Sequence, residues 1–287
     1  MIGRTKGSSH EEIDAGVFDW RLVIGTPYHK SEIGNRKLFT RSPDPPIGGF
    51  VDFTASPVYF LGMAAVPNPA KTPAKQLLIG YYAALLRRFG PQQWWPGRTR
   101  LEVILGAILT QNTAWHNATL ALRKLRQAGL LSWRGLRAAG LDTLEACVRP
   151  AGFYRQKART IRNFVDWLER EHGGSLSRLF SLPAEELRRR LLELRGVGPE
   201  TADAILLYAA ERPLFVADAY TRRVLSRHDV ISADSGYHET QEFLHTHLPR
   251  EAAFFNEFHA LLVEVGKKHC TPHSPSCPGC PLEEFLA

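Results

Sequence analysis

Apolar residues recur with a helical period along most of this 287-residue chain. From residue 74 onward, Leu77, Leu78, Tyr81, Tyr82 and Leu85 follow the spacing that gathers side chains on one face of a helix. No alternating run typical of a strand reaches a comparable length. The sequence therefore predicts an all-α protein. The predicted helices cover residues 75–89, 100–109, 113–128, 143–148, 155–172, 184–193, 199–210, 218–226, 236–247 and 251–266.

The first part of the chain differs from the rest. Residues 1–75 are rich in glycine and proline and show no sustained helical period, so we expect a poorly ordered N-terminal extension there. The longest apolar runs, such as residues 103–109, are too short to cross a bilayer, and the first six residues lack the apolar core of a secretory signal. We therefore expect a soluble, cytoplasmic protein.

The chain is basic, with a formal net charge of +7 and an isoelectric point of about 9.4. This charge suits a polyanionic partner, although many proteins of similar charge bind none. Two basic runs are candidates for phosphate contacts: Arg188–Arg190, and residues 149–162, where Arg155, Arg159 and Arg162 would share one helix face. A solvated surface is the alternative for both runs.

A glycine-rich turn precedes the predicted helix over residues 199–210. Gly196 and Gly198 permit backbone angles closed to other residues, and Pro199 suits the first turn of a helix. Free amide hydrogens at such a helix start bind a phosphate with little sequence preference. The plainer alternative is that Gly196-Val197-Gly198 only ends one helix and begins the next.

Three of the four cysteines lie close together near the C-terminus, as Cys270-x6-Cys277-x2-Cys280, while Cys147 stands alone. In a chain without an export signal, such clustering favours metal ligation over disulfides. Cys147 is expected to pack in the core.

The stretch from Leu194 to Asp203, followed by residues 215–223 with Asp218 among them, resembles the helix-hairpin-helix and catalytic aspartate of DNA glycosylases of the endonuclease III superfamily. The resemblance runs from about Gln76 to the C-terminus. It implies a two-lobed, all-α helix-hairpin-helix glycosylase domain over residues 76–268 and a C-terminal cysteine-cluster loop over residues 269–287. The hairpin residues that it assigns to DNA binding are Arg195, Gly196, Val197, Gly198, Glu200 and Thr201.

In that superfamily the aspartate matched by Asp218 assists departure of the base. Cleavage of the glycosidic bond develops positive charge on the sugar, and a fixed carboxylate nearby lowers the barrier. An aspartate before Ala219-Tyr220-Thr221 would also cap a helix, and both roles can hold together. Members that cut the backbone carry a lysine where this chain has Glu200, which cannot form a Schiff base. The resemblance therefore predicts base removal without lyase activity.

Three further segments look like the 3-methyladenine glycosylase branch: Trp94-Trp95-Pro96-Gly97, residues 105–115 and residues 145–158. In that branch, aromatic rings matching one of Trp94 and Trp95, together with Trp115, sandwich the extruded base. An N3-alkylated adenine is cationic, so such rings would select it; core packing is the alternative for the Trp94 and Trp95 pair. Gln111 resembles the residue that enters the gap left by the flipped base.

Some positions depart from the pattern of the family. Leu261 stands where members of the branch can carry a modified lysine, and the nearby His259 either faces the site or, as we favour, packs in the core or at the surface. Endonuclease III proteins bind a [4Fe-4S] cluster through Cys-x6-Cys-x2-Cys-x5-Cys, but the fourth position here is Leu286. His269, His273 or Glu284 could complete the cluster. The alternatives are a zinc site or loss of the metal.

The sequence as a whole predicts a monomeric base excision repair enzyme of the nucleoid. Its partner would be duplex DNA that contains a damaged base, and its substrate an alkylated purine. An endonuclease III-like glycosylase for oxidised pyrimidines or mismatched bases is the first alternative. A noncatalytic protein that binds DNA lesions is the second.

Overall fold

The structure is a computed structural model, and it describes residues 72–286 of the chain. The extension expected over residues 1–75 lies almost wholly outside the described residues. Within them the regular structure is helical, and the one pairing of β type is an isolated bridge between Cys270 and Pro275. The predicted all-α class is confirmed.

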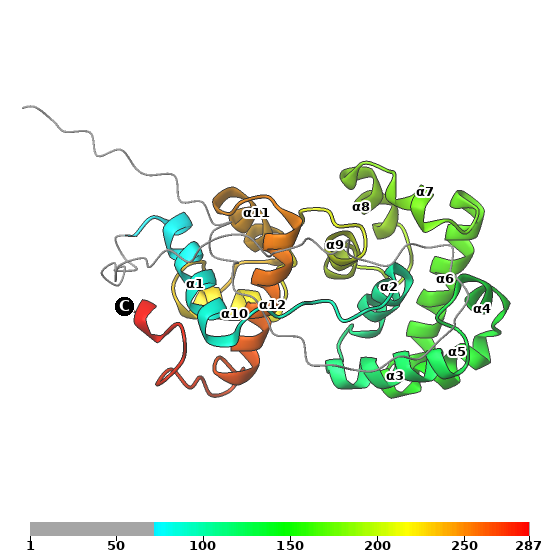
Figure 1. Cartoon of the computed structure of the whole chain (residues 1–287), viewed down its shortest axis with the longest axis horizontal. Coiled ribbons are helices and arrows are strands. Elements are labelled where there is room, and N and C mark those ends of the chain that lie inside the picture. The colour runs from blue at the N-terminus through cyan, green and yellow to red at the C-terminus, as the bar shows by residue number, and fades with distance from the viewer. Residues whose placement is uncertain (1–71, 287) are drawn as a thin grey trace, which may run out of the picture. The chain divides into compact units, whose positions relative to one another are not determined.

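One group of helices is contiguous in sequence. Its members are α2 (Arg100–Leu109), α3 (Trp115–Gln127), α4 (Trp133–Ala138), α5 (Leu141–Val148), the 3-10 turn η2 (Arg149–Ala151), α6 (Tyr154–His172), α7 (Leu176–Phe180), α8 (Ala184–Leu192) and α9 (Pro199–Tyr208). In this group α2 packs against α3, α6 and α9, and α5 packs against α3 and α6. The pair α8 and α9 forms a helical hairpin (Figure 1).

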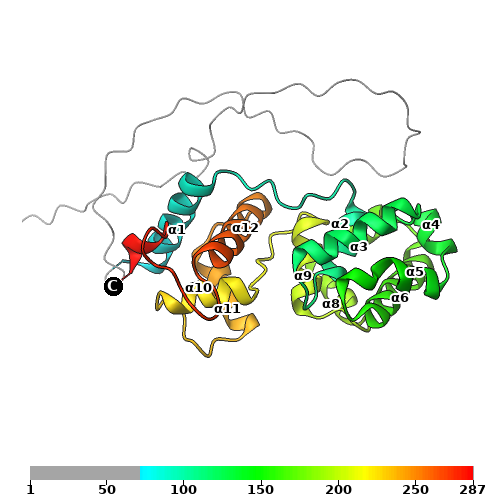
Figure 2. The same ribbon diagram turned by 90° about the horizontal axis from the view of Figure 1, so that it is seen from below.

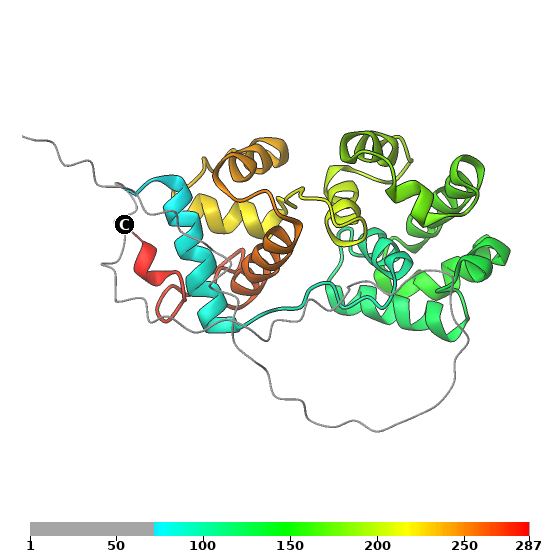
Figure 3. The ribbon, with the colours of Figure 1, turned by 45° about the horizontal axis from the view of Figure 1, so that its top comes forward.

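The second group brings together helices from both ends of the described chain. Here α1 (Ala74–Phe89) packs against α11 (Tyr237–His247) and α12 (Ala252–Lys268), while α10 (Ala219–Arg227) packs against α12. The placement of α1 beside α12 is visible in Figures 2 and 3. Contacts between α9 and α12 join the two groups, which correspond to the two expected lobes.

Side-chain caps explain where several helices begin. The hydroxyl of Thr99 accepts a hydrogen bond from the amide of Glu102 at the start of α2, and Ser132 and Ser175 cap α4 and α7 in the same way. The sequence analysis missed α4 and α7, because helices of six and five residues are too short to establish a hydrophobic period. The other α-helices lie close to their predicted bounds.

The core of the second group is aromatic. Phe254, Phe255 and Phe258 of α12 are fully buried, and they pack with Tyr82 of α1 and Phe215 at ring-centroid distances of 4.6–6.1 Å. By contrast, α2 is buried on all sides, as its nearly unbroken apolar sequence requires. Among residues 72–286, no helix combines the length and the apolar character that spanning a bilayer requires.

Candidate active site

Asp218 lies where an extended connection from α9 enters α10. It is the N-cap residue of α10, and its Oδ1 accepts a hydrogen bond of 2.8 Å from the amide of Thr221. Its Oδ2 lies 3.4 Å from Nε2 of His259 in α12. Only 9% of Asp218 is exposed to solvent. The expected capping role is therefore present, and the second carboxylate oxygen faces a titratable partner.

His259 connects Asp218 to a buried tyrosine. The hydroxyl of Tyr208 and Nδ1 of His259 are 2.5 Å apart, and burial raises the pKa of Tyr208 well above its ordinary value. The histidine is buried, as the favoured expectation has it, but it also contacts the candidate catalytic carboxylate. A single histidine on an apolar helix face gave little signal for this contact in the sequence, because α12 and α10 meet only in the folded chain.

The electrostatics favour an ionised Asp218. Burial raises the pKa of its carboxyl group, whereas the His259 imidazole and the hydrogen bonds from Thr221 lower it. The lowering effects are larger together, so the pKa of Asp218 is below its ordinary value. Glu200 keeps solvent-exposed surface, yet partial burial and then the charge of Asp218 raise the pKa of its carboxyl. Glu200 therefore lies within electrostatic reach of Asp218.

The three candidate pocket tryptophans lie together. The ring centroid of Trp115 is 4.8 Å from that of Trp94 and 5.0 Å from that of Trp95, both with edge-to-face geometry. Trp95 also lies 5.2 Å from the ring of Tyr208, which links the cluster through His259 to Asp218. Because the rings touch edge to face, a base can stack between Trp94 and Trp115 only if one of these rings rotates.

Trp95 is held by close packing against α2. A Cβ atom at Gly106 would lie 2.7 Å from Cζ2 of Trp95, so only glycine lets the indole approach the helix this closely. The indole nitrogen of Trp95 is buried without a hydrogen-bond partner in the described part of the chain. The donor is available to a ligand that enters the cluster.

The hairpin between α8 and α9 has the expected glycine turn. Gly196 has a φ of 96°, and a Cβ atom there would lie 2.1 Å from Oγ1 of Thr160. Gly198 is the N-cap of α9 with an ordinary φ of −97°, and no side chain caps this helix start. The side chains of Val197 and Thr201 are buried, so any DNA contact they make goes through their backbone.

Gln111 is tied to this hairpin. Its Nε2 donates to the carbonyl of Gly196 at 2.9 Å and to the hydroxyl of Thr201 at 2.7 Å. Arg195, at the tip of the turn, is exposed. The sequence-predicted DNA-binding residues are thus brought together at one turn, and Gln111 in this structure braces that turn.

Several members of the two basic runs are engaged in contacts within the protein. Arg188 forms a bidentate pair with the buried Asp203, and Arg189 and Arg190 pair with Glu186. In the second run, Arg162 donates to backbone carbonyls of residues 136 and 139. The expectation that Arg155, Arg159 and Arg162 form one free basic face is therefore wrong for Arg162.

Lys157 is buried in the same run and has an internal role. Its ammonium group donates to the carbonyls of Leu109 and Ala151, and burial lowers its pKa to about 8. Arg155 and Arg159 remain exposed, and the nearest acid to Arg155 is Glu145 at 3.9 Å. Together with the exposed Arg149, these two arginines stay available for phosphate contacts.

An exposed aromatic residue escaped the sequence analysis. Phe153 is 69% exposed and has a φ of 44°, in the left-handed region that is strained for a bulky residue. It precedes Tyr154. The guanidinium carbons of Arg149 and Arg155 lie 5.2 and 5.5 Å from the centroid of the Tyr154 ring. The sequence signal was the phenylalanine after Gly152, at the start of a basic helix.

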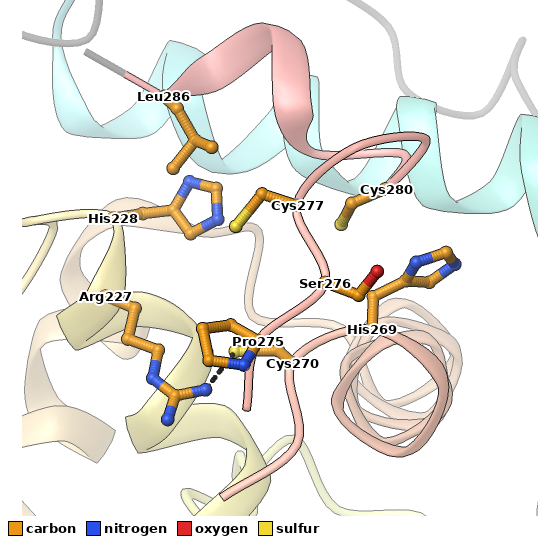
Figure 4. Close-up of a pocket in the computed structure, with 9 residues that line it drawn as sticks. All are labelled: Arg227, His228, His269, Cys270, Pro275, Ser276, Cys277, Cys280 and Leu286. Atoms are coloured by element: carbon orange, nitrogen blue, oxygen red, sulfur yellow. Dashed lines mark hydrogen bonds between the residues drawn. The ribbon is translucent and has the colours of Figure 1, made fainter. Parts of the chain in front are cut away.

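The three clustered cysteines line one cavity of about 220 Å³ (Figure 4). Leu286, the residue at the expected fourth ligand position, lines the same cavity. Burial raises the pKa of the Cys280 thiol, and the neighbouring Cys277 and Cys270 add to this effect. The sequence-predicted ligands therefore face one another in space.

The cavity can be compared with what a single metal ion and a cluster each require. No set of three His, Cys, Asp or Glu side chains within residues 72–286 converges closely enough to hold one metal ion. A cluster of several irons and sulfides has its ligands spread around a larger volume, with one thiolate on each iron. Arg227 donates to Sγ of Cys270 at 3.3 Å, and such a hydrogen bond stabilises a thiolate.

Comparison with known proteins agrees with this geometry. Residues 105–250, which contain the hairpin and Asp218, match the family described as HhH-GPD superfamily base excision DNA repair protein. A protein of Methanocaldococcus jannaschii named as a candidate DNA repair glycosylase, MJ1434, is 41% identical over 212 residues, which cover 73% of this chain and 96% of that protein. The chain belongs to the HhH-GPD superfamily of base excision DNA repair glycosylases.

Further HhH-GPD relatives are named endonuclease III. That of Sulfolobus acidocaldarius is 29% identical over 192 residues, covering 66% of this chain and 83% of the relative. Among solved structures, endonuclease III trapped covalently on DNA has a TM-score of 0.64 at 24% identity, covering 75% of this chain and 96% of that one. The Helicobacter pylori 3-methyladenine DNA glycosylase bound to 1,N6-ethenoadenine has a TM-score of 0.60 at 26% identity. The match covers 69% of this chain and 98% of that one.

Proposed function

We propose that this protein is a monofunctional DNA glycosylase that hydrolyses the glycosidic bond of an alkylated purine in duplex DNA. The observation that carries the proposal is the chain of contacts from Asp218 through His259 and Tyr208 to Trp95. It connects a carboxylate of lowered pKa to an aromatic cluster.

The proposed chemistry follows from charge. As the glycosidic bond breaks, the sugar becomes positive, and the ionised Asp218 stabilises this charge and orients the attacking water. Thr221 donates a hydrogen bond to one carboxylate oxygen and His259 lies 3.4 Å from the other, so the carboxylate is positioned before the substrate arrives. The carboxylate itself must be anionic, which its lowered pKa supports at neutral pH.

An alkylated purine suits the aromatic cluster. A base alkylated at N3 is cationic and leaves the sugar without prior protonation, and stacking on tryptophan stabilises it by roughly 0.5–2 kcal/mol per contact. The related Helicobacter pylori enzyme, whose structure contains a modified adenine, supports a purine substrate. In our proposal, Trp94 or Trp115 rotates to admit the base, and the free indole N–H of Trp95 donates to it.

The absence of lyase activity is proposed from Glu200. This residue occupies the position at which bifunctional members carry a lysine, and the side chains near Asp218 include no lysine among the described contacts. Borohydride treatment of enzyme mixed with lesion DNA should therefore leave no covalent complex. A trapped complex would overturn this part of the proposal.

Phe153 is proposed to enter the DNA stack. An exposed apolar side chain beside basic residues is suited to fill the gap that forms when a nucleotide is extruded. Replacing Phe153 by alanine should lower base release from duplex DNA by roughly 10-fold or more, at a cost of about 1–3 kcal/mol for the lost stacking. The melting temperature should not change, because the side chain is outside the core.

The deciding experiment is incubation with a panel of lesion-bearing duplexes and mass analysis of the released bases. We expect 3-methyladenine or a related alkylated purine, released by the wild type and not by Asp218→Asn. Release of oxidised pyrimidines instead would favour the endonuclease III-like alternative, which the relatives of that name support. Lesion binding without release by the wild type would identify a noncatalytic binding protein.

For the C-terminal loop, we propose an iron-sulfur cluster that stabilises the fold. The three thiols around one cavity and the hydrogen bond from Arg227 to Cys270 support it. Bound there, the cluster would order residues 270–286, and it has no part in the glycosidic chemistry.

A further inference from the structure

The cavity lined by the three cysteines has no metal ligand at the position that the fourth cysteine would occupy. Leu286 occupies the sequence position of the fourth cysteine and lines the cavity, but a leucine side chain cannot bind iron. A cluster held in this cavity by four protein ligands therefore needs a donor other than the residue at position 286.

His228 lies next to Leu286 in this cavity. It is the C-cap residue of α10, distant in sequence from the cysteine loop, and it lines the same cavity as the three cysteines and Leu286. In Figure 4 its imidazole lies between Leu286 and Cys277. The other histidine of the cavity, His269, is on the side of Cys280.

One ring nitrogen of His228 has no hydrogen-bond partner in the described part of the chain. Its Nδ1 is buried and makes no hydrogen bond within residues 72–286. The ring is held in place by Tyr81, whose centroid is 5.3 Å away in edge-to-face geometry, and by a hydrogen bond that it donates to the backbone carbonyl of Phe285. A fixed imidazole with a buried, unpaired nitrogen is suited to bind a metal.

We propose that His228 is the fourth protein ligand of an iron-sulfur cluster whose other ligands are Cys270, Cys277 and Cys280. Imidazole nitrogen is an established substitute for thiolate on cluster iron. The assignment rests on the proposed presence of a cluster, and it replaces His269, His273 and Glu284, the donors that sequence spacing put forward.

The assignment makes α10 part of the cluster site. Arg227 and His228 at its C-terminal end would face the cluster, while Asp218 caps its N-terminal end. The helix that positions the candidate catalytic carboxylate would thus be fixed at both ends.

The test uses the full-length protein reconstituted with iron and sulfide under anaerobic conditions. The wild type should bind about four irons per chain, and pulsed EPR of the reduced cluster should show coupling to nitrogen that changes when histidine carries the heavy nitrogen isotope. His228→Ala should lose this coupling and fall to about three irons per chain, with the EPR signal of an oxidised three-iron cluster.

Two controls separate ligation from folding. His269→Ala, a change to the other histidine of the cavity, should keep the iron content and the nitrogen coupling of the wild type. His228→Ala combined with Leu286→Cys should regain about four irons without nitrogen coupling, because it restores four thiolates.

The outcomes distinguish the two proposals. A wild type that binds a four-iron cluster without histidine coupling, or a His269→Ala variant that loses it, overturns the ligand assignment and leaves the cluster in place. A wild type that takes up no iron overturns both. Glycosidic activity is measured separately, so neither result depends on the proposed substrate.

Discussion

At the scale of single residues, substitution can separate the observed capping role of Asp218 from its proposed catalytic role. Asparagine caps helices about as well as aspartate but carries no charge. Asp218→Asn should therefore keep the stability of the protein and lower base release by about 10²–10³-fold, the size of effect expected when a preorganised charge is lost. Asp218→Ala should lose activity and also about 1 kcal/mol of folding free energy. A stable, active Asp218→Asn enzyme in a base-release assay would contradict the catalytic role.

We expect His259 to influence the pH range in which Asp218 is ionised. The imidazole lowers the pKa of the carboxyl, whereas burial raises it. Replacing His259 by glutamine should therefore raise the pKa of Asp218, so that activity is lost at a higher pH as the solution is acidified. The measurement is the pH profile of single-turnover base release for both proteins. An unchanged acidic limb would show that His259 does not act on the carboxylate.

At the scale of helices and turns, the hairpin depends on one of its two glycines. Gly196→Ala would place a Cβ atom against Thr160 at a positive φ, so we expect a loss of about 1–3 kcal/mol and weaker DNA binding. Gly198→Ala is the matched control, since its Cβ would meet no atom within 4 Å and its φ is ordinary. Thermal unfolding compares the two variants. Equal melting temperatures would contradict this account of the turn.

A buried network fixes α8, α9 and α11 to one another. Asp203 is fully buried and accepts hydrogen bonds from Arg188, Tyr237 and Gln241 at 2.6–3.1 Å. Asp203→Ala leaves Arg188 half-buried without its partner, and we expect a loss of about 3–5 kcal/mol in denaturant unfolding. Glu186→Ala, which removes exposed ion pairs on α8, should leave the free energy of unfolding nearly unchanged.

The sequence predicted what its local patterns encode. Helices with a long apolar period, the turn at Gly196 and the cap at Asp218 follow from neighbouring residues, so they could be located in advance. The contact between His259 and Asp218 joins helices that are far apart in the chain. The position of His228 beside the cysteines likewise depends on segments that are distant in sequence. No local spacing carries that information. The role of Arg188 was misjudged because its partner, Asp203, lies on the next helix.

At the scale of the whole molecule, the net charge of +7 overstates the charge available to DNA. Arg155 and Arg159 are exposed, while Arg162 is engaged with backbone carbonyls. Replacing either exposed arginine by alanine should reduce the slope of log affinity against log salt by about 1. Arg162→Ala should leave the slope unchanged and lower the melting temperature. A change of slope for Arg162→Ala alone would show that the exposed pair is not the phosphate contact.

The pairing of α1 with α12 also bears on how the chain is made. The α2–α9 group is continuous, so it can collapse while later residues are still inside the ribosome. The helix α1 precedes this group in the chain, but its packing partners among the described helices, α11 and α12, are synthesised after it. Until α11 and α12 are made they cannot cover the apolar face of α1, so we expect this helix to be a binding site for chaperones during synthesis.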